Sequence, residues 1–251
     1  MWYQNVPDGV RTVNARLGPA GWKDEPVSST STDRSYGGES AAGRTARRRA
    51  ALVDAAATVM SDGRWRAATV AGLCADAQLN KRYFYESFPD LDALADAVID
   101  DISGEVVQAA VGAYLGLLDR PLADQARGAV DAVVGVLGTD RRKARILLGG
   151  AAGTPAADER RTEAMTGLTA VLIEHARTIH DVELEADSLA RTAPAFVIGG
   201  SAQAILAWAE GTLPVSRTDL VDDISALWLA LGTAASELAR SRLESGTHRV
   251  E

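Results

Sequence analysis

The sequence has few of the residues that several common protein classes need. It contains one cysteine, so no internal disulfide can form, and this usage fits a reducing cytoplasm. Aromatic residues make up only 5% of the 251 residues. No run reaches about 18 consecutive apolar residues, so we expect no membrane span and no membrane partner. The first residues also lack the apolar core of a signal peptide.

Enzyme signatures are absent as well. The chain has no glycine-rich phosphate loop and no cluster with the spacing of metal ligands. Two of its three histidines, His175 and His180, are five residues apart and do not share a helix face. We therefore expect no catalytic residue, no metal and no cofactor, and we retain an all-α enzyme only as a remote alternative.

Apolar residues recur at helical spacing through most of the chain. They make up 47% of it, alanine is abundant, and no alternating strand of convincing length is present. The spacing predicts an all-α fold of about nine helices. We expect helices near residues 44–62, 69–77, 80–88, 90–119, 122–137, 140–148, 165–179, 188–210 and 220–238, with loops at 149–159 and 211–219. Pro194 falls either in the first turns of its helix or at a kink.

Residues 1–40 differ in composition from the rest. They are rich in Gly, Pro, Ser and Thr and show no period, so we expect a mostly disordered arm. Three alternatives remain for it: a tail without function, an arm that contacts DNA, or a mis-assigned start codon. We expect a first domain over 41–89 and a second helical domain over 90–245.

The most informative stretch is Thr69 to Phe88. Thr69 is a natural N-cap, and apolar residues follow it at three- and four-residue spacing. A short turn and a second cap, Asn80, precede a helix that opens with cationic and phenolic side chains and ends before Pro89. This pattern, over residues 68–88, is typical of a helix-turn-helix, whose second helix enters the major groove of DNA.

The charge distribution supports DNA contact by this stretch. The whole chain has a net charge of −8, yet residues 41–85 contain eight basic and three acidic residues. The first turns of the first helix carry arginines, where positive charge opposes the helix dipole, so phosphate contact explains them better than stability does. Arg64 and Arg66 flank Trp65, and the spacing leaves phosphate contact by these two arginines open. Trp65, Cys74, Phe84 and Phe88 are expected to be core residues.

Residues 44–100 resemble the DNA-binding domain of tetracycline-repressor (TetR)-family transcription regulators. The similarity rests on the Thr69 cap, the small residues at 74 and 77, the Asn-Lys pair at 80–81, the aromatic pair at 84–85, Phe-Pro at 88–89, and Leu-Asp-Ala-Leu at 91–94. The chain departs from the family pattern at five positions: Gly72, Gln78, Arg82, Tyr83 and Leu91. Gln78 stands where the family has glycine, so we expect it to adopt a left-handed conformation at some strain.

The resemblance and the helix geometry together assign roles at the DNA. Thr69 and Tyr85 are expected to bind phosphate, and Lys81 a phosphate or a base edge. Arg82 is the candidate for bidentate hydrogen bonding to guanine, with Tyr83 beside it at the bases. The full set of expected DNA-binding residues is Arg44, Arg47, Arg48, Thr69, Asn80, Lys81, Arg82, Tyr83 and Tyr85.

A short recognition helix supplies a small interface, so we expect a homodimer on a palindromic operator. The last two long helices are the candidates for dimerisation, with internal core as the alternative interpretation of their apolar stripes. The interface residues expected are Gly199, Gly200, Ala204, Leu220, Ile224, Leu227, Trp228 and Leu231.

By resemblance, the middle helices enclose a cavity for an unknown small-molecule effector. Polar or aromatic residues on otherwise apolar helices are the candidates to line it: Tyr114, His175, Arg191, Gln203 and Trp208. Few charges lie on the inner stripes, so we expect an apolar or amphipathic effector. The resemblance thus implies a cytoplasmic repressor that such an effector releases from double-stranded DNA, with a ligand-independent or architectural DNA-binding protein as the alternative.

Overall fold

The structure is a computed structural model that describes residues 40–150, 155–156, 158–163, 165–166 and 187–247. Every regular element in these residues is a helix, which confirms the all-α fold class for the described part of the chain. The predicted arm over 1–40, apart from Ser40, lies outside the described residues, as does most of the helix predicted over 165–179.

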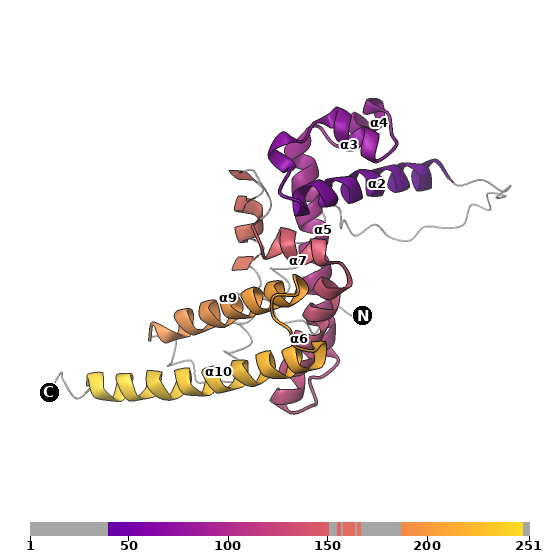
Figure 1. Cartoon of the computed structure of the whole chain (residues 1–251). Helices are drawn as coiled ribbons and strands as arrows, with labels where there is room; N and C mark the ends of the chain where they lie inside the picture. The colour runs from indigo at the N-terminus through magenta and orange to yellow at the C-terminus, as the bar shows by residue number, and fades with distance from the viewer. Residues whose placement is uncertain (1–39, 151–154, 157, 164, 167–186, 248–251) are drawn as a thin grey trace, which may run out of the picture.

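The chain's described part begins with a long helix, a 3₁₀ turn and two short helices. These are α2 (Ala41–Ser61), η2 (Trp65–Ala67), α3 (Val70–Asp76) and α4 (Lys81–Ser87). Figure 1 shows α3 and α4 at one end of the molecule, beside α2.

α2 begins three residues earlier than predicted. The hydroxyl of Ser40 accepts a hydrogen bond from the Gly43 amide at 3.0 Å, so Ser40 is an N-cap that the sequence reasoning overlooked. The helix ends at Ser61, and the predicted stop, Gly63, follows its C-cap with a φ of +70° that suits a residue without a side chain.

A continuous apolar core joins these helices to the next one. Trp65 is 3% exposed and Phe84 is fully buried, as predicted for core residues. Cys74 is buried too, and burial raises the pKa of its thiol, so it behaves as a small apolar residue. The remaining buried residues of this region are Leu52, Ala55, Ala56, Val59, Met60, Leu73 and Phe88.

α5 (Leu91–Leu115) is the longest link between the two ends of the molecule. Asp90 caps it, because its carboxylate accepts a hydrogen bond from the Ala93 amide at 2.8 Å. Its predicted inner stripe is confirmed at four positions, all at most 5% exposed: Leu94, Val98, Ile102 and Val106. In Figure 1, α5 runs from the α3–α4 end into the layer of later helices.

Four further helices follow: α6 (Leu122–Thr139), α7 (Arg141–Leu147), α9 (Leu189–Ala209) and α10 (Arg217–Thr247). α6 packs along α5, α10 packs on α6 and α9, and α7 packs on α2. α9 and α10 run side by side away from α5 and α6 (Figure 1). The loop predicted over 149–159 is wrong at its end, because residues 155–156 and 158–159 are helical.

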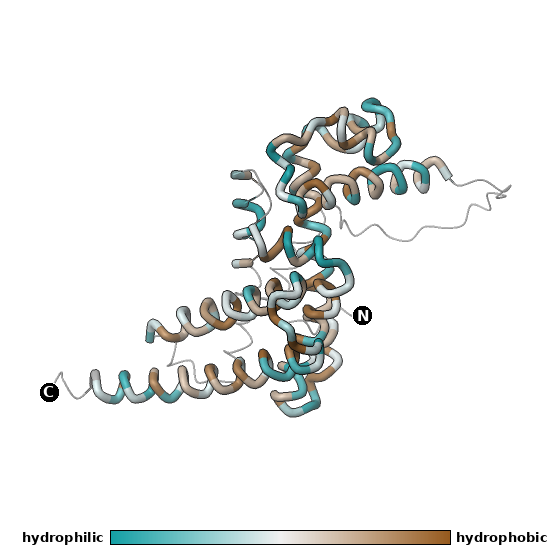
Figure 2. Tube along the Cα trace, in the orientation of Figure 1, coloured by the Kyte–Doolittle hydropathy of each residue, from teal (hydrophilic) through white to brown (hydrophobic). Residues whose placement is uncertain are grey.

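α9 and α10 expose much apolar surface. Phe196 is 68% exposed and Leu227 is 57% exposed, and Figure 2 shows apolar segments along both helices. Among the described residues, one helical segment, Thr192–Ala209, is long and apolar enough to cross a membrane, and 11% of it is buried. One such helix is weak evidence for a span, since a helix that packs on a partner protein has the same composition.

The turn between α3 and α4 depends on Gln78. Its φ is +55°, the left-handed conformation expected from its place in the sequence, and it is the one non-glycine residue with positive φ in the described part. The turn is closed by a hydrogen bond from the Leu79 amide to the Cys74 carbonyl at 2.8 Å. A side chain in this conformation is strained, whereas glycine adopts it freely.

We predict that Gln78→Gly stabilises the protein. Relief of left-handed strain should outweigh the added entropy of the unfolded chain and raise the free energy of unfolding by about 0.5–1 kcal/mol. Ala75→Gly, a matched change on the exposed face of α3, should lower it by about 1 kcal/mol. Urea denaturation of both variants measures the difference, and a loss of stability in Gln78→Gly would contradict the strain argument.

Candidate nucleic-acid interface

The two short helices α3 and α4 are joined as a helix-turn-helix requires. Thr69 is the N-cap of α3, with its Oγ1 accepting a hydrogen bond from the Gly72 amide at 3.1 Å. Asn80 occupies the N-cap position of α4 in extended backbone geometry. The predicted N-cap position is therefore confirmed, but the Asn80 side chain does not make the capping hydrogen bond expected of it. The Asn80 amide is exposed at the start of α4.

The outer face of α4 is cationic and phenolic. Lys81 and Arg82 are exposed in its first turn, and Tyr85 is 61% exposed one turn later. Phe84 points the other way and is fully buried, with its ring edge-on to Tyr85 at 5.4 Å between centroids. The core residue thus fixes the rotation of α4 and leaves these three side chains on the solvent face.

Arg82 is held by its own helix. Its Nε donates to Oε1 of Glu86 at 2.8 Å, and this hydrogen bond raises the pKa of the guanidinium. The Arg82 side chain is 83% exposed, so the pair contributes little to stability and can rearrange. The bond to Glu86 uses the Nε–H and leaves the end of the guanidinium to project outward. That end has the two parallel N–H donors that match guanine O6 and N7.

Arg48 and Tyr83 form one unit instead of two separate contacts. The guanidinium carbon of Arg48 lies 4.1 Å from the centre of the Tyr83 ring, and its Nη2 donates to Thr45 Oγ1 at 3.1 Å. Both residues are half-buried between α2 and α4. This position revises the expectation for Arg48. Its guanidinium orients the Tyr83 ring, and a phosphate contact would have to use the N–H groups that do not bind Thr45.

The other predicted arginines of α2, Arg44 and Arg47, are exposed in its first turns, and the first turn of the helix itself contains no acidic residue. Arg49 was not among the predicted contact residues, and it has a structural place. Its guanidinium lies 5.1 Å from the Phe88 ring centre and 3.7 Å from an Asp101 carboxylate oxygen. Arg49 therefore connects α2 with the end of α4 and with α5. Only its place in an arginine run could have drawn attention to it.

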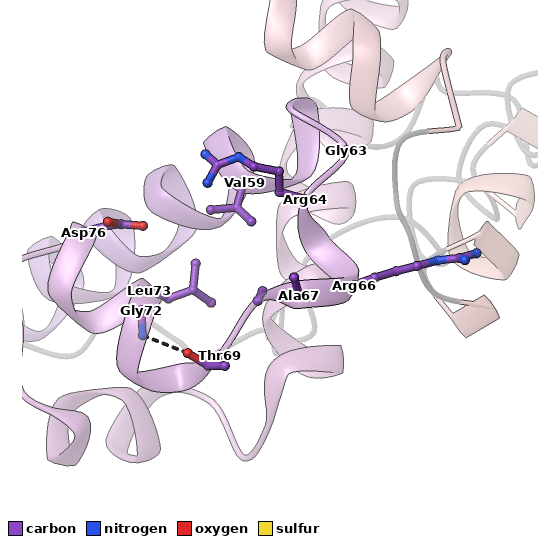
Figure 3. A pocket seen from close by; sticks show the side chains of 10 residues that line it. Val59, Gly63, Arg64, Arg66, Ala67, Thr69, Gly72, Leu73 and Asp76 are labelled. Atoms are coloured by element: carbon purple, nitrogen blue, oxygen red, sulfur yellow. Dashed lines mark hydrogen bonds between the residues drawn. The ribbon is translucent and has the colours of Figure 1, made fainter.

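A shallow hollow of about 310 Å³ lies beside Thr69, between the end of α2, η2 and α3 (Figure 3). Arg64 and Asp76 lie on facing sides of it, whereas Arg66 points away. Arg64 is already paired with Asp62 at 2.9 Å. Since its lining carries both signs of charge and is mostly small and apolar, the hollow is not built for phosphate. It is also distinct from the effector cavity expected among the middle helices.

Three of the five residues expected at an effector cavity have described side chains, and each has its own surroundings. Tyr114 is half-buried in α5, where burial raises the pKa of its phenol, and Gln203 is exposed on α9. The Trp208 indole donates to the Val215 carbonyl at 3.2 Å and lies where a side chain at Gly138 would be, so it holds the α9–α10 connection against α6. His175 lies outside the described residues, and the side chain of Arg191 is not described.

The residues expected at a dimer interface divide into two groups. Leu220 and Ile224 are 2% and 4% exposed within one chain, so they belong to its core and that part of the expectation is corrected. Trp228 is part-buried, and its indole donates to Ser201 Oγ at 2.7 Å between α9 and α10. The others retain surface for a partner: Gly199, Gly200 and Leu227 are exposed, and Ala204 and Leu231 are half-buried.

Among the described residues, no group of three or more His, Cys, Asp or Glu side chains is placed to hold a metal ion. The ionisable groups of the region instead pair with one another or face solvent. The chemistry available at the α3–α4 end is therefore hydrogen bonding and charge, which is the chemistry of phosphate and base-edge contact.

No family model matches the chain, and no curated protein matches it. Solved structures do. A candidate transcriptional regulator from Pseudomonas aeruginosa PAO1 is 17% identical over 76% of this chain and 93% of its own, with a TM-score of 0.63. The transcriptional regulator FadR from Bacillus subtilis, in complex with stearoyl-CoA, is 13% identical over 71% and 96%, with a TM-score of 0.55. A TetR-like regulator from Rhodococcus sp. RHA1 is 21% identical over 73% and 96%, with a TM-score of 0.52.

These three are regulators of transcription, and each is covered over almost its whole length. The TM-scores of 0.52–0.63 show that the architecture is shared, whereas identities of 13–21% carry no inference about individual residues. The chain therefore has the all-α fold of TetR-like transcriptional regulators.

Proposed function

We propose that this protein is a sequence-specific DNA-binding regulator of transcription. The observation that carries the proposal is the solvent face of α4, where Lys81, Arg82 and Tyr85 project from a short helix held by a buried Phe84. This face belongs to the basic segment 41–85 of an acidic chain. Residues 41–89 would bind DNA, and the acidic remainder would orient the approach by repelling phosphate.

The contacts divide into two kinds. Arg82, aimed by Glu86, would bind a guanine edge, and Tyr83, held by Arg48, would face the neighbouring base. Arg44, Arg47, Thr69, Asn80, Lys81 and Tyr85 would fix the register on phosphates and sugars. Thr69 accepts a hydrogen bond from within α3 and still has its own hydroxyl proton to donate.

We predict different losses for two arginine variants. Arg82→Ala should weaken binding to the operator by about 1–3 kcal/mol while changing non-specific binding little. Arg47→Ala should weaken all sequences alike and reduce the salt slope by about one. Fluorescence anisotropy on an operator selected from random DNA, over a salt series, measures both. Wild-type affinity in both variants would show that this face does not bind DNA.

We further propose that α9 and α10 pair with their copies in a second chain, so that two copies of α4 meet a palindromic operator. Leu227 and Phe196 are exposed and apolar, and Gly199 and Gly200 allow close approach of a helix. Residues 90–245 would thus form the dimerisation domain. The alternative occupant of this surface, a membrane, is an outcome of the same test.

Leu227→Asp should dissociate the dimer, because it places a charge in an apolar interface. Sedimentation velocity should then give a monomer, with a loss of operator binding. Leu118→Asp is the matched control: Leu118 is 50% exposed and lies in the connection between α5 and α6, outside the two helices of the proposed interface, so its change should leave the dimer intact. A Leu227→Asp variant that still sediments as a dimer would exclude this surface.

The effector would be apolar or amphipathic, and its release of the protein from DNA would make the protein a repressor. The Bacillus subtilis FadR structure contains stearoyl-CoA, which is a ligand of that chemical class. We predict that a panel of fatty acids, acyl-CoA thioesters and apolar drugs contains a compound that lowers operator affinity at least about fivefold. If every compound leaves anisotropy unchanged, the ligand-independent DNA-binding alternative is favoured.

A further inference from the structure

The helix α7 packs on α2, and Arg142 of α7 adds side-chain hydrogen bonds to this contact. Arg142 Nη1 donates to Thr58 Oγ1 at 2.7 Å, and its Nη2 donates to Asp54 Oδ1 at 2.9 Å. Both partners lie on α2, 84 and 88 residues earlier in the chain. One planar side chain thus spans from the body of the protein to the helix that carries the DNA-binding unit.

The Arg142 guanidinium is also held by the N-cap residue of its own helix, Asp140. Arg142 Nε donates to Asp140 Oδ2 at 2.9 Å, and Asp140 also caps α7 by accepting from the Arg142 amide at 2.9 Å. The Arg142 side chain is 32% exposed and that of Asp140 is 29% exposed. These charge-assisted, partly buried hydrogen bonds hold the Arg142 guanidinium in one orientation, whereas a flexible ion pair on the surface leaves its side chains free to move.

α2 is rigidly joined to the recognition helix. Leu52 and Phe84 belong to one buried core, and Arg48 lies over the Tyr83 ring. Any rotation of α2 therefore carries α4 with it. On the other side, α7 packs on α5, α6 and α9, so the Arg142 bond connects the DNA-binding helices to the helices that carry the proposed dimer surface.

We infer that Arg142 is a positioning residue that fixes the angle between the DNA-binding helices and the body, and thereby sets which half-site spacing the dimer accepts. The inference rests on the proposed function. In a symmetric dimer, a change of angle occurs in both copies, so it alters the separation of the two recognition helices. That separation must match one turn of DNA, roughly 34–36 Å, or a multiple of it.

The test is a series of palindromic operators whose half-sites are moved apart or together by one and two base pairs. Wild type should prefer one spacing. Arg142→Gln should bind that spacing about tenfold more weakly and the others nearly unchanged, so that the preference shrinks. Arg142→Lys, which keeps the charge but loses the planar fork, should fall between the two.

A matched control is available in the same chain. Arg127 on α6 pairs with Asp222 on α10 at 2.6 Å, and this pair is exposed and remote from α2. Arg127→Gln removes an ion pair of the same kind and should leave the spacing preference unchanged. Asp54→Ala is a milder second variant, because Asp54 is 69% exposed and its loss removes one of the two α2 side chains that Arg142 binds, while Thr58 remains. It should shrink the preference in the same direction.

A second readout needs no DNA. Hydrogen exchange over 51–61 of α2 should accelerate in Arg142→Gln and not in Arg127→Gln, because only the first removes hydrogen bonds between α7 and α2. An equal loss of affinity at every spacing, or unchanged exchange over α2, would overturn the inference. If wild type binds no DNA sequence specifically, the proposed function fails, and the exchange experiment still decides whether Arg142 holds α2.

Discussion

The packing of α2 is the constraint on which the rest of the structure depends. This one helix forms a wall shared by α3, α4, α5 and α7. Its buried face, with Leu52, Ala56 and Met60 fully enclosed, completes the core under the recognition helix. Its opposite edge carries the groups that Arg142 binds. Because an interior this closely packed transmits displacement, α2 cannot move without moving α4.

The arginines near the α3–α4 end serve structure as well as charge. Arg48 lies over an aromatic ring, Arg49 bridges three helices, and Arg82 is paired along its own helix. Each of these positive charges is thus held in a defined position by its partners, and they do not form a diffuse patch. In a chain with a net charge of −8, this ordering concentrates the favourable field on one small surface.

Local features of the fold could be predicted from the sequence, and features set by distant partners could not. The caps at Thr69, Asp90 and Asp140, and the left-handed Gln78, follow from neighbours a few residues away. The bond between Arg142 and Asp54 joins residues 88 apart, and no spacing signals it. An apolar stripe in the sequence likewise does not indicate which element covers it. Leu220 and Leu227 have the same sequence character, yet α6 and its neighbours bury only the first. Glu86, four residues after Arg82, was readable as a helical pair and was overlooked.

α10 is synthesised after every element against which it packs. Until it emerges from the ribosome, α6 and α9 lack the surface that Leu220, Val221 and Ile224 supply. The nascent chain therefore carries uncovered apolar helices for most of its translation, which is a state that holdase chaperones bind. The DNA-binding helices α2, α3 and α4 are made earlier and pack on one another and on α5. Folding during synthesis would then proceed in two stages, with the body as the slow and aggregation-sensitive one.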